Sequence, residues 1–126
     1  MATLILIVED DESTRDIYRD ALEARGYTVL TAKHGAEGVH MARKYLPRLI
    51  LLDIRMPVMD GWHALQYLRT DHQTARMSIW GVSAHFDEET APVPGFDRLL
   101  SKPLDPADLV LEVESHIGPA IPPPAA

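Results

Sequence analysis

Acidic residues follow directly after two of the most apolar stretches of the chain. Glu9 and Asp10 come after the aliphatic run 4–8. Asp53 comes after the apolar segment 49–52. Short aliphatic runs of this kind are typical of strands that are buried on both faces of a parallel sheet. Since ligands of such sheets bind at the carboxyl ends of the strands, the three carboxylates would converge there if the two strands are neighbours.

A converging set of carboxylates needs a compensating cation. Two like charges about 4 Å apart repel by roughly 4 kcal/mol at an effective dielectric of about 20. Mg²⁺ is usually held by a few carboxylates together with water and a phosphoryl oxygen, so it would offset this repulsion. Ser83 and Lys102 each follow a further predicted strand, which places a hydroxyl and an ammonium at the same edge. The pattern therefore favours a site for a divalent cation and a phosphoryl group over a solvated loop.

Alternating strand and helix patterns position these residues. The order β-α, repeated five times, specifies a parallel sheet with helices on both faces, which is a doubly wound α/β fold. The predicted strands are 4–8, 27–32, 49–52, 78–82 and 98–100.

Capping residues and apolar spacing predict the helices. Ser13 is expected to cap a first helix that runs to residue 25. Arginines alternate with acidic residues along it, which predicts a solvated face that includes Arg15. Trp62 begins the apolar stripe of a later helix and is expected in the core. Asp105, followed by Pro106 at the first helical position, caps the last helix.

Composition excludes several classes of function. The chain has 126 residues, a formal net charge of −7 and no cysteine. Its length fits one domain over residues 1–118, and the proline-rich residues 119–126 are expected to form a tail or linker that does not pack. The negative charge argues against binding of nucleic acid or an anionic membrane, and no apolar run approaches the ~20 residues of a membrane span. The lack of cysteine excludes disulfides and thiolate sites and fits a reducing compartment.

Four short motifs carry a resemblance to a known family. They are Glu9-Asp10, the stretch L-I-L-L-D-I-R-M-P-V-M-D-G around Asp53, Ser83-Ala84 and Lys102-Pro103. Together they resemble the receiver domain of two-component response regulators, over residues 4–117. The resemblance implies a flavodoxin-like sheet with strand order 2-1-3-4-5. It also implies a cytoplasmic phosphoacceptor protein, not an enzyme, whose partner is a histidine kinase or a phosphotransfer protein.

The resemblance assigns roles to individual residues. Asp53 would be the phosphoacceptor. Mg²⁺ or Mn²⁺ would be bound by Asp10, by Asp53, by the backbone carbonyl of Arg55 and, through water, by Glu9. The groups expected to bind the phosphoryl oxygens are Ser83, Ala84 and Lys102. The peptide bond before Pro103 would be cis, and hydrolysis would be tuned by Arg55 and His85, with a long-lived acyl phosphate as the expected result.

Two features depart from the family pattern. The switch position, three residues before Lys102, is commonly aromatic, but here it is Leu99. A leucine lacks the ring that couples to a serine in the usual switch. Pro92 and Pro94 also interrupt the segment that would form the family's fourth helix. We therefore expect this helix to be short or irregular, and residues 86–95 to form a loop that activation can order.

Three other classes of protein fit the same residues less well. A haloacid-dehalogenase-like phosphatase needs a second aspartate two residues after the first, where this chain has Arg55. A flavodoxin-like cofactor binder needs a glycine-rich or hydroxyl-rich loop after the first strand, where this chain has the acidic run 9–12. The remaining alternative is a receiver-like module that binds proteins without being phosphorylated. An intact acidic cluster with its lysine argues against it.

Overall fold

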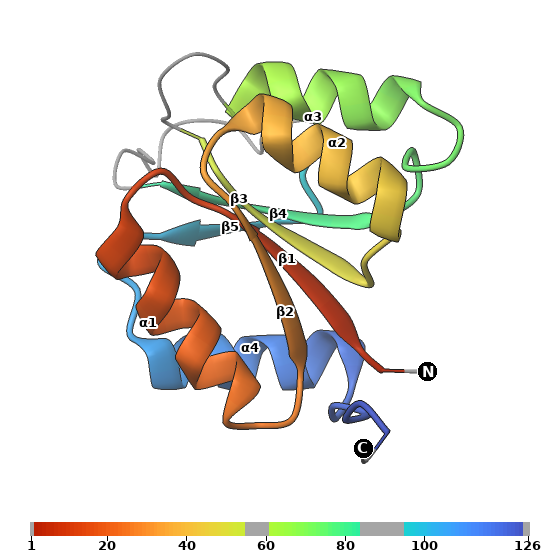
Figure 1. Cartoon of the computed structure of the whole chain (residues 1–126). Helices are drawn as coiled ribbons and strands as arrows, with labels where there is room; N and C mark the ends of the chain where they lie inside the picture. Colours follow the sequence, from red (N-terminus) through yellow and green to blue (C-terminus); the bar gives the residue numbers. More distant parts are fainter. Residues whose placement is uncertain (1, 55–60, 84–94, 125–126) are drawn as a thin grey trace.

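Five parallel strands form a single twisted sheet (Figure 1). The computed structural model describes residues 2–54, 61–83 and 95–124. The strands lie in the order β2-β1-β3-β4-β5, with every neighbouring pair parallel. Their bounds are β1 Leu4–Val8, β2 Thr28–Ala32, β3 Leu49–Asp53, β4 Ser78–Ser83 and β5 Arg98–Ser101. The topology confirms the predicted fold class.

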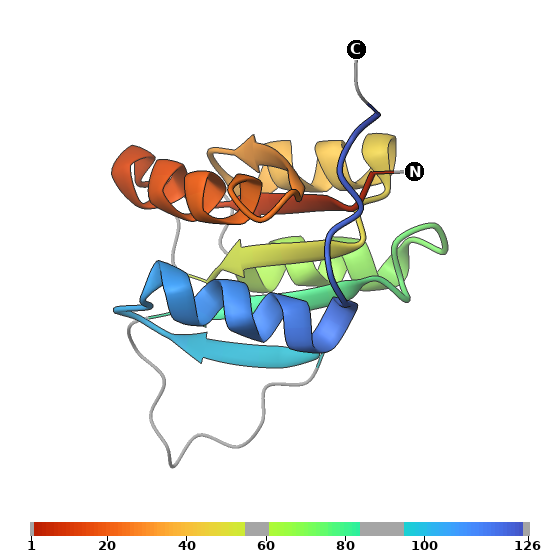
Figure 2. The same cartoon turned by 90° about the horizontal axis from the view of Figure 1, so that it is seen from below.

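Helices cover both faces of the sheet (Figures 1 and 2). On one face lie α1 (Glu12–Glu23) and α4 (Pro106–Ile117), and on the other lie α2 (Gly35–Tyr45) and α3 (Gly61–Thr70). Alternate residues of β1 enter the two cores: Ile5 and Ile7 pack on the α1–α4 side, and Leu6 and Val8 on the α2–α3 side. A strand with both faces covered has no polar side, which explains the unbroken aliphatic runs in the sequence.

Helix α4, which follows β5, begins at the predicted residues. As predicted, Asp105 caps this helix by accepting a hydrogen bond from the amide of Ala107 at 2.8 Å, and Pro106 occupies its first turn. The prediction of a short or irregular helix between β4 and β5 falls on residues 84–94, which lie outside the described residues. Within the described ranges, no helix is long and apolar enough to cross a membrane.

Two local predictions are wrong. Ser13 does not cap α1; Asp11 does, because its carboxylate accepts hydrogen bonds from the Thr14 amide at 2.9 Å and the Thr14 hydroxyl at 2.6 Å. Trp62 is not a core residue, since it is 42% exposed, although its ring packs edge to face with Phe96 at 5.8 Å between centroids. The buried stripe of α3 is Gly61, Ala64, Leu65 and Leu68, which turns the residue after Gly61 outward.

The proline-rich tail packs against the domain, contrary to the prediction. Ile121 and Thr3 exchange two hydrogen bonds: the Thr3 amide donates to the Ile121 carbonyl, and the Ile121 amide donates to the Thr3 hydroxyl, both at 2.9 Å. The Tyr27 hydroxyl donates to the Gly118 carbonyl at 2.7 Å, and Ala120 packs on the core. Figure 2 shows the tail running from the end of α4 past the amino ends of the strands, beside the N-terminus. These partners are Thr3, just before β1, and Tyr27, just before β2, and the composition of the tail does not reveal them.

We expect Thr3→Val to lower the free energy of unfolding by about 1 kcal/mol, because it leaves the Ile121 amide without its acceptor. Urea denaturation monitored by circular dichroism measures this change. Thr28→Val is the matched control, because the buried Thr28 hydroxyl has no hydrogen-bond partner among the described residues. Its stability should equal or exceed that of the wild type. Equal losses in both variants would contradict a specific role for the tail contact.

Candidate functional site

Three carboxylates meet at the carboxyl ends of β1 and β3. The two strands are neighbours, with Val8 paired to Leu52, so the residues that follow them lie at one edge. One carboxylate oxygen from each of Glu9, Asp10 and Asp53 lies within 4.8 Å of the others. Glu9 is 3% exposed and Asp53 5%, whereas Asp10 is open to solvent. The structure thus brings together the three acidic residues that the sequence singled out.

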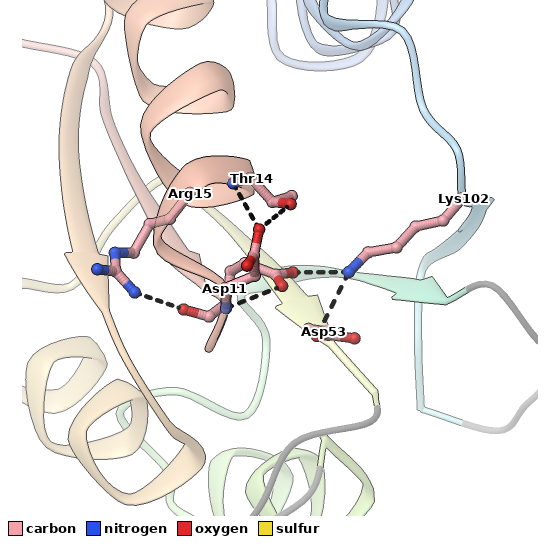
Figure 3. A network of polar contacts seen from close by, with 6 residues as sticks. Asp11, Thr14, Arg15, Asp53 and Lys102 are labelled. Atoms are coloured by element: carbon pink, nitrogen blue, oxygen red, sulfur yellow. Dashed lines mark hydrogen bonds and ion pairs between the residues drawn. The ribbon is translucent and has the colours of Figure 1, made fainter.

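Lys102, which follows β5, joins two of these carboxylates (Figure 3). Its ammonium donates to Glu9 Oε2 at 2.9 Å and to Asp53 Oδ2 at 3.4 Å. Burial by itself lowers the pKa of Lys102, but the hydrogen bond and negative charge of Glu9, followed by those of Asp53, outweigh it and raise the pKa above its usual value. The ammonium therefore stays charged and neutralises part of the cluster.

Backbone pairing brings Lys102 to this edge. The Lys102 amide donates to the Ser83 carbonyl at 2.9 Å, which continues the pairing of β5 with β4 past Ser101. The peptide bond between Lys102 and Pro103 is cis. Ser83 is buried at the end of β4, two strands from β1 and next to β3. Three further predicted site residues, Arg55, Ala84 and His85, lie outside the described residues.

Helix α3 approaches the site through a glycine. A Cβ atom at Gly61 would lie 2.6 Å from the backbone oxygen of Asp53, a distance that no other residue type could accept. The Gly61 amide also donates to the Ile54 carbonyl at 2.9 Å. Glycine at this position therefore lets α3 begin directly against the end of β3. This close contact helps to fix the backbone of Asp53.

Helix α1 contains a residue whose predicted environment is wrong. Arg15 is not on a solvated face: it is 8% exposed, and its Nη1 donates to the Glu9 carbonyl at 3.0 Å. Its spacing with Tyr18 and Leu22, the other buried residues of α1, is the signal that could have identified it. Hydrogen bonds from Thr14 to Asp11 on the same turn hold the pKa of the Asp11 carboxyl below its usual value.

The predicted switch position lies on the edge strand β5, beside β4. Leu99 on β5 is half-buried and pairs with Gly81 of β4. A Cβ atom at Gly81 would lie 3.0 Å from Leu99 Cδ2, so the leucine side chain fills the space that the glycine leaves. The role of Leu99 in switching stays a prediction.

The arrangement suits a hard divalent cation and a phosphoryl group. The described residues that could bind a metal offer only oxygen ligands, which is the donor chemistry of Mg²⁺ and Mn²⁺. A fixed ammonium stands beside the carboxylate of Asp53, where it can neutralise an additional anion. Phosphoryl transfer depends mainly on such positioning and charge neutralisation.

The known proteins that this chain resembles in sequence are response regulators. A family model described as the response regulator receiver domain matches residues 5–114. The polar-differentiation response regulator DivK of Brucella anthropi is 31% identical over 123 residues, which cover 95% of this chain and 100% of that protein.

Solved structures agree with the sequence comparison. The receiver domain of the sensor histidine kinase PA1611 from Pseudomonas aeruginosa, solved with a magnesium ion coordinated in its active-site cleft, is 29% identical. The match has a TM-score of 0.83 and covers 94% of this chain and 99% of that one. The chemotaxis response regulator CheY4 of Vibrio cholerae is 26% identical, with a TM-score of 0.83 over 91% of this chain and 98% of that one. By sequence, topology and the placement of its acidic cluster, the chain belongs to the family of response regulator receiver domains.

Proposed function

We propose that this receiver domain accepts a phosphoryl group on Asp53 from a histidine kinase or a phosphotransfer protein, with a divalent cation bound beside it. The observation that carries the proposal is the cluster of Glu9, Asp10 and Asp53, closed on one side by Lys102. Such a concentration of charge serves no packing purpose, since two of its carboxylates are almost fully buried. The repulsion between these carboxylates is offset when a divalent cation binds among them.

Each residue has a distinct role in this proposal. An oxygen of the Asp53 carboxylate attacks phosphorus and forms an acyl phosphate, while the bond from phosphorus to the donor histidine nitrogen breaks. The cation, Mg²⁺ or Mn²⁺, neutralises phosphoryl charge when it is bound. Asp10 and Asp53 would supply its direct carboxylate ligands, with Glu9 acting through water. Lys102 would pair with a phosphoryl oxygen from the position that it already holds against Asp53.

The roles of the remaining predicted residues extend the same site. Ser83 ends the strand next to Asp53 and would hydrogen-bond the phosphoryl group. The Arg55 carbonyl as a metal ligand, Ala84 as a phosphoryl contact and Arg55 and His85 as modulators of hydrolysis are carried by their motif positions alone. In this proposal the domain is a phosphoacceptor protein and not an enzyme. The lack of cysteine supports placing it in the cytoplasm.

Phosphorylation by a small donor tests the proposal without a partner protein. The wild-type domain is incubated with acetyl phosphate and Mg²⁺, and intact-mass spectrometry measures the phosphorylated fraction. We expect the addition of one phosphoryl group, and no addition when EDTA removes the metal. If the protein takes no phosphoryl group from acetyl phosphate or from any histidine kinase, it is a phosphorylation-independent binding module instead.

An apolar hollow beside Lys102 supports a protein as the phosphoryl donor. The hollow has a volume of about 460 Å³ and is lined by Thr14, Ile17, Tyr18, Lys102, Pro103, Leu104 and Pro106. Ile17 on α1 is 51% exposed, although a large aliphatic side chain gains nothing from solvent. Lys102 both lines this hollow and pairs with Asp53, so a donor protein that delivers a phosphoryl group to Asp53 would lie close to it. We therefore infer that the donor protein places an apolar side chain here.

We expect Ile17→Glu to slow phosphoryl transfer from the partner protein by about tenfold or more, because it places a charge in the apolar contact. Phosphorylation by acetyl phosphate should proceed at the wild-type rate, because the small donor needs no docking surface. Tyr67→Glu is the matched control, since Tyr67 is also 51% exposed but lies on α3, across the sheet. Equal effects of the Ile17 change on both donors would exclude this hollow as a docking site.

A further inference from the structure

Arg15 is a nearly buried cation to which the proposed chemistry gives no role. It lies in the first turns of α1, and only 8% of its surface is exposed. Arginine is rarely buried to this extent unless its guanidinium is paired. Its partner is a backbone group: Nη1 donates to the Glu9 carbonyl at 3.0 Å. The contact therefore joins α1 to the residue that follows β1 and begins the acidic cluster.

Glu9 is held at its amide, its carbonyl and both carboxylate oxygens. Its amide donates to the Ala32 carbonyl on β2 at 3.0 Å. Its side chain accepts from the Asp11 amide at 3.3 Å through Oε1 and from Lys102 at 2.9 Å through Oε2. The Arg15 guanidinium completes the set at the carbonyl. Glu9 is thus held in place by β2, by the Asp11 amide, by α1 and by the residue after β5.

The carbonyl contact matters because Asp10 follows directly. The peptide plane between Glu9 and Asp10 contains the carbonyl that Arg15 binds, so this contact sets the direction in which the chain leaves β1. Asp10 is exposed, and the path of the backbone determines where its carboxylate lies. Figure 3 shows Arg15 and Lys102 approaching the turn from opposite sides. Lys102 neutralises the cluster, and Arg15 anchors the backbone behind it.

We propose that Arg15 is a positioning residue, whose hydrogen bond to the Glu9 carbonyl holds Glu9 and Asp10 in the geometry that binds the divalent cation. The inference rests on the cation site of the proposed function. The direction of the change in Mg²⁺ affinity distinguishes this positioning role from a simple charge effect. Arg15 is itself a cation, so loss of its charge alone would tighten binding of Mg²⁺, whereas loss of its positioning weakens it.

Isothermal titration calorimetry of Mg²⁺ binding to the full chain tests the proposal. We expect Arg15→Met to weaken Mg²⁺ binding by about tenfold or more, the range found when groups that orient metal ligands are removed. Arg15→Lys keeps a donor and the charge, so it should restore most of the affinity. Arg19→Met is the matched control, because it makes the same change in charge on α1 at a half-exposed residue paired with Asp16 and Asp20. It should leave the Mg²⁺ affinity unchanged or slightly higher.

Amide hydrogen exchange of the metal-free protein supplies a second measurement. The Asp11 amide, which donates to Glu9, should exchange faster in Arg15→Met than in the wild type or Arg19→Met. If Arg15→Met does not fold, Arg15→Gln replaces it. Its amide is about two bonds shorter and falls short of the carbonyl, so it should weaken binding in the same way.

The outcomes distinguish this proposal from the proposed function. Wild-type affinity, or tighter binding, in folded Arg15→Met or Arg15→Gln overturns the positioning role and leaves the proposed function intact. A stability loss with unchanged Mg²⁺ affinity likewise shows that Arg15 only supports the fold. Failure of the wild type to bind Mg²⁺ overturns the proposed function and this inference together.

Discussion

Replacing Asp53 by asparagine is expected to abolish phosphorylation by acetyl phosphate and by any partner kinase. The amide nitrogen and oxygen of asparagine are poor nucleophiles toward phosphorus, and the change also removes one carboxylate from the cation site. The domain should still fold, because asparagine has nearly the same shape and adds no charge to the buried edge of the sheet. Intact-mass spectrometry measures the phosphorylated fraction, and circular dichroism checks the fold.

Two further variants test whether the loss is specific to Asp53. Asp108→Asn makes the same chemical change at an exposed residue in the first turn of α4, and it should be phosphorylated like the wild type. Asp10→Asn keeps the nucleophile but removes a metal ligand, so a high Mg²⁺ concentration should restore part of its phosphorylation. A phosphoryl group retained on the Asp53 variant would show that another residue is the acceptor.

Replacing Lys102 by methionine is expected to destabilise the metal-free protein and to slow phosphorylation strongly. The change leaves Glu9 and Asp53, whose side chains are 4% and 5% exposed, without the ammonium that pairs with both. Removing one partner of a buried ion pair costs about 3–5 kcal/mol. The Lys102 side chain is 23% exposed, which favours the lower end of that range. Urea denaturation without metal measures the loss.

Mg²⁺ should partly reverse the loss of stability in Lys102→Met. A divalent cation supplies the positive charge that the variant lacks, so Mg²⁺ should raise its urea midpoint more than that of the wild type. Lys33→Met is the control, because Lys33 is exposed just after β2 and its removal should change neither stability nor phosphorylation. An unchanged free energy of unfolding for metal-free Lys102→Met would contradict the proposed electrostatic role.

Much of the framework could be predicted because it depends on local chemistry. Aliphatic runs such as 4–8 predicted strands buried on both faces, and all five strands form where they were expected. The pair Asp105-Pro106 predicted the start of α4, since a cap acts within one helical turn. Acidic residues directly after the apolar runs 4–8 and 49–52 predicted the cluster, because parallel strands that are neighbours must end at the same edge.

Several features depended on contacts between residues far apart in the chain. Burial of Arg15 follows from the packing of α1 against the sheet, although its charge pattern predicted a solvated face. Docking of the tail requires the amide and the hydroxyl of Thr3, which lies 118 residues from Ile121.

Local sequence therefore determined where strands and helices form and which acidic residues converge, because short-range sterics, capping and the burial of apolar runs act within a few residues. The sequence also placed the ammonium of Lys102 at the same edge, but only the tertiary structure decided which charged groups form pairs there. The pairing of Lys102 with Glu9 and Asp53 joins the ends of three strands, and the hydrogen bond from Arg15 joins a helix to the end of β1. Such contacts depend on the distance and burial of groups after folding, and neither quantity is contained in the spacing of residues along the chain.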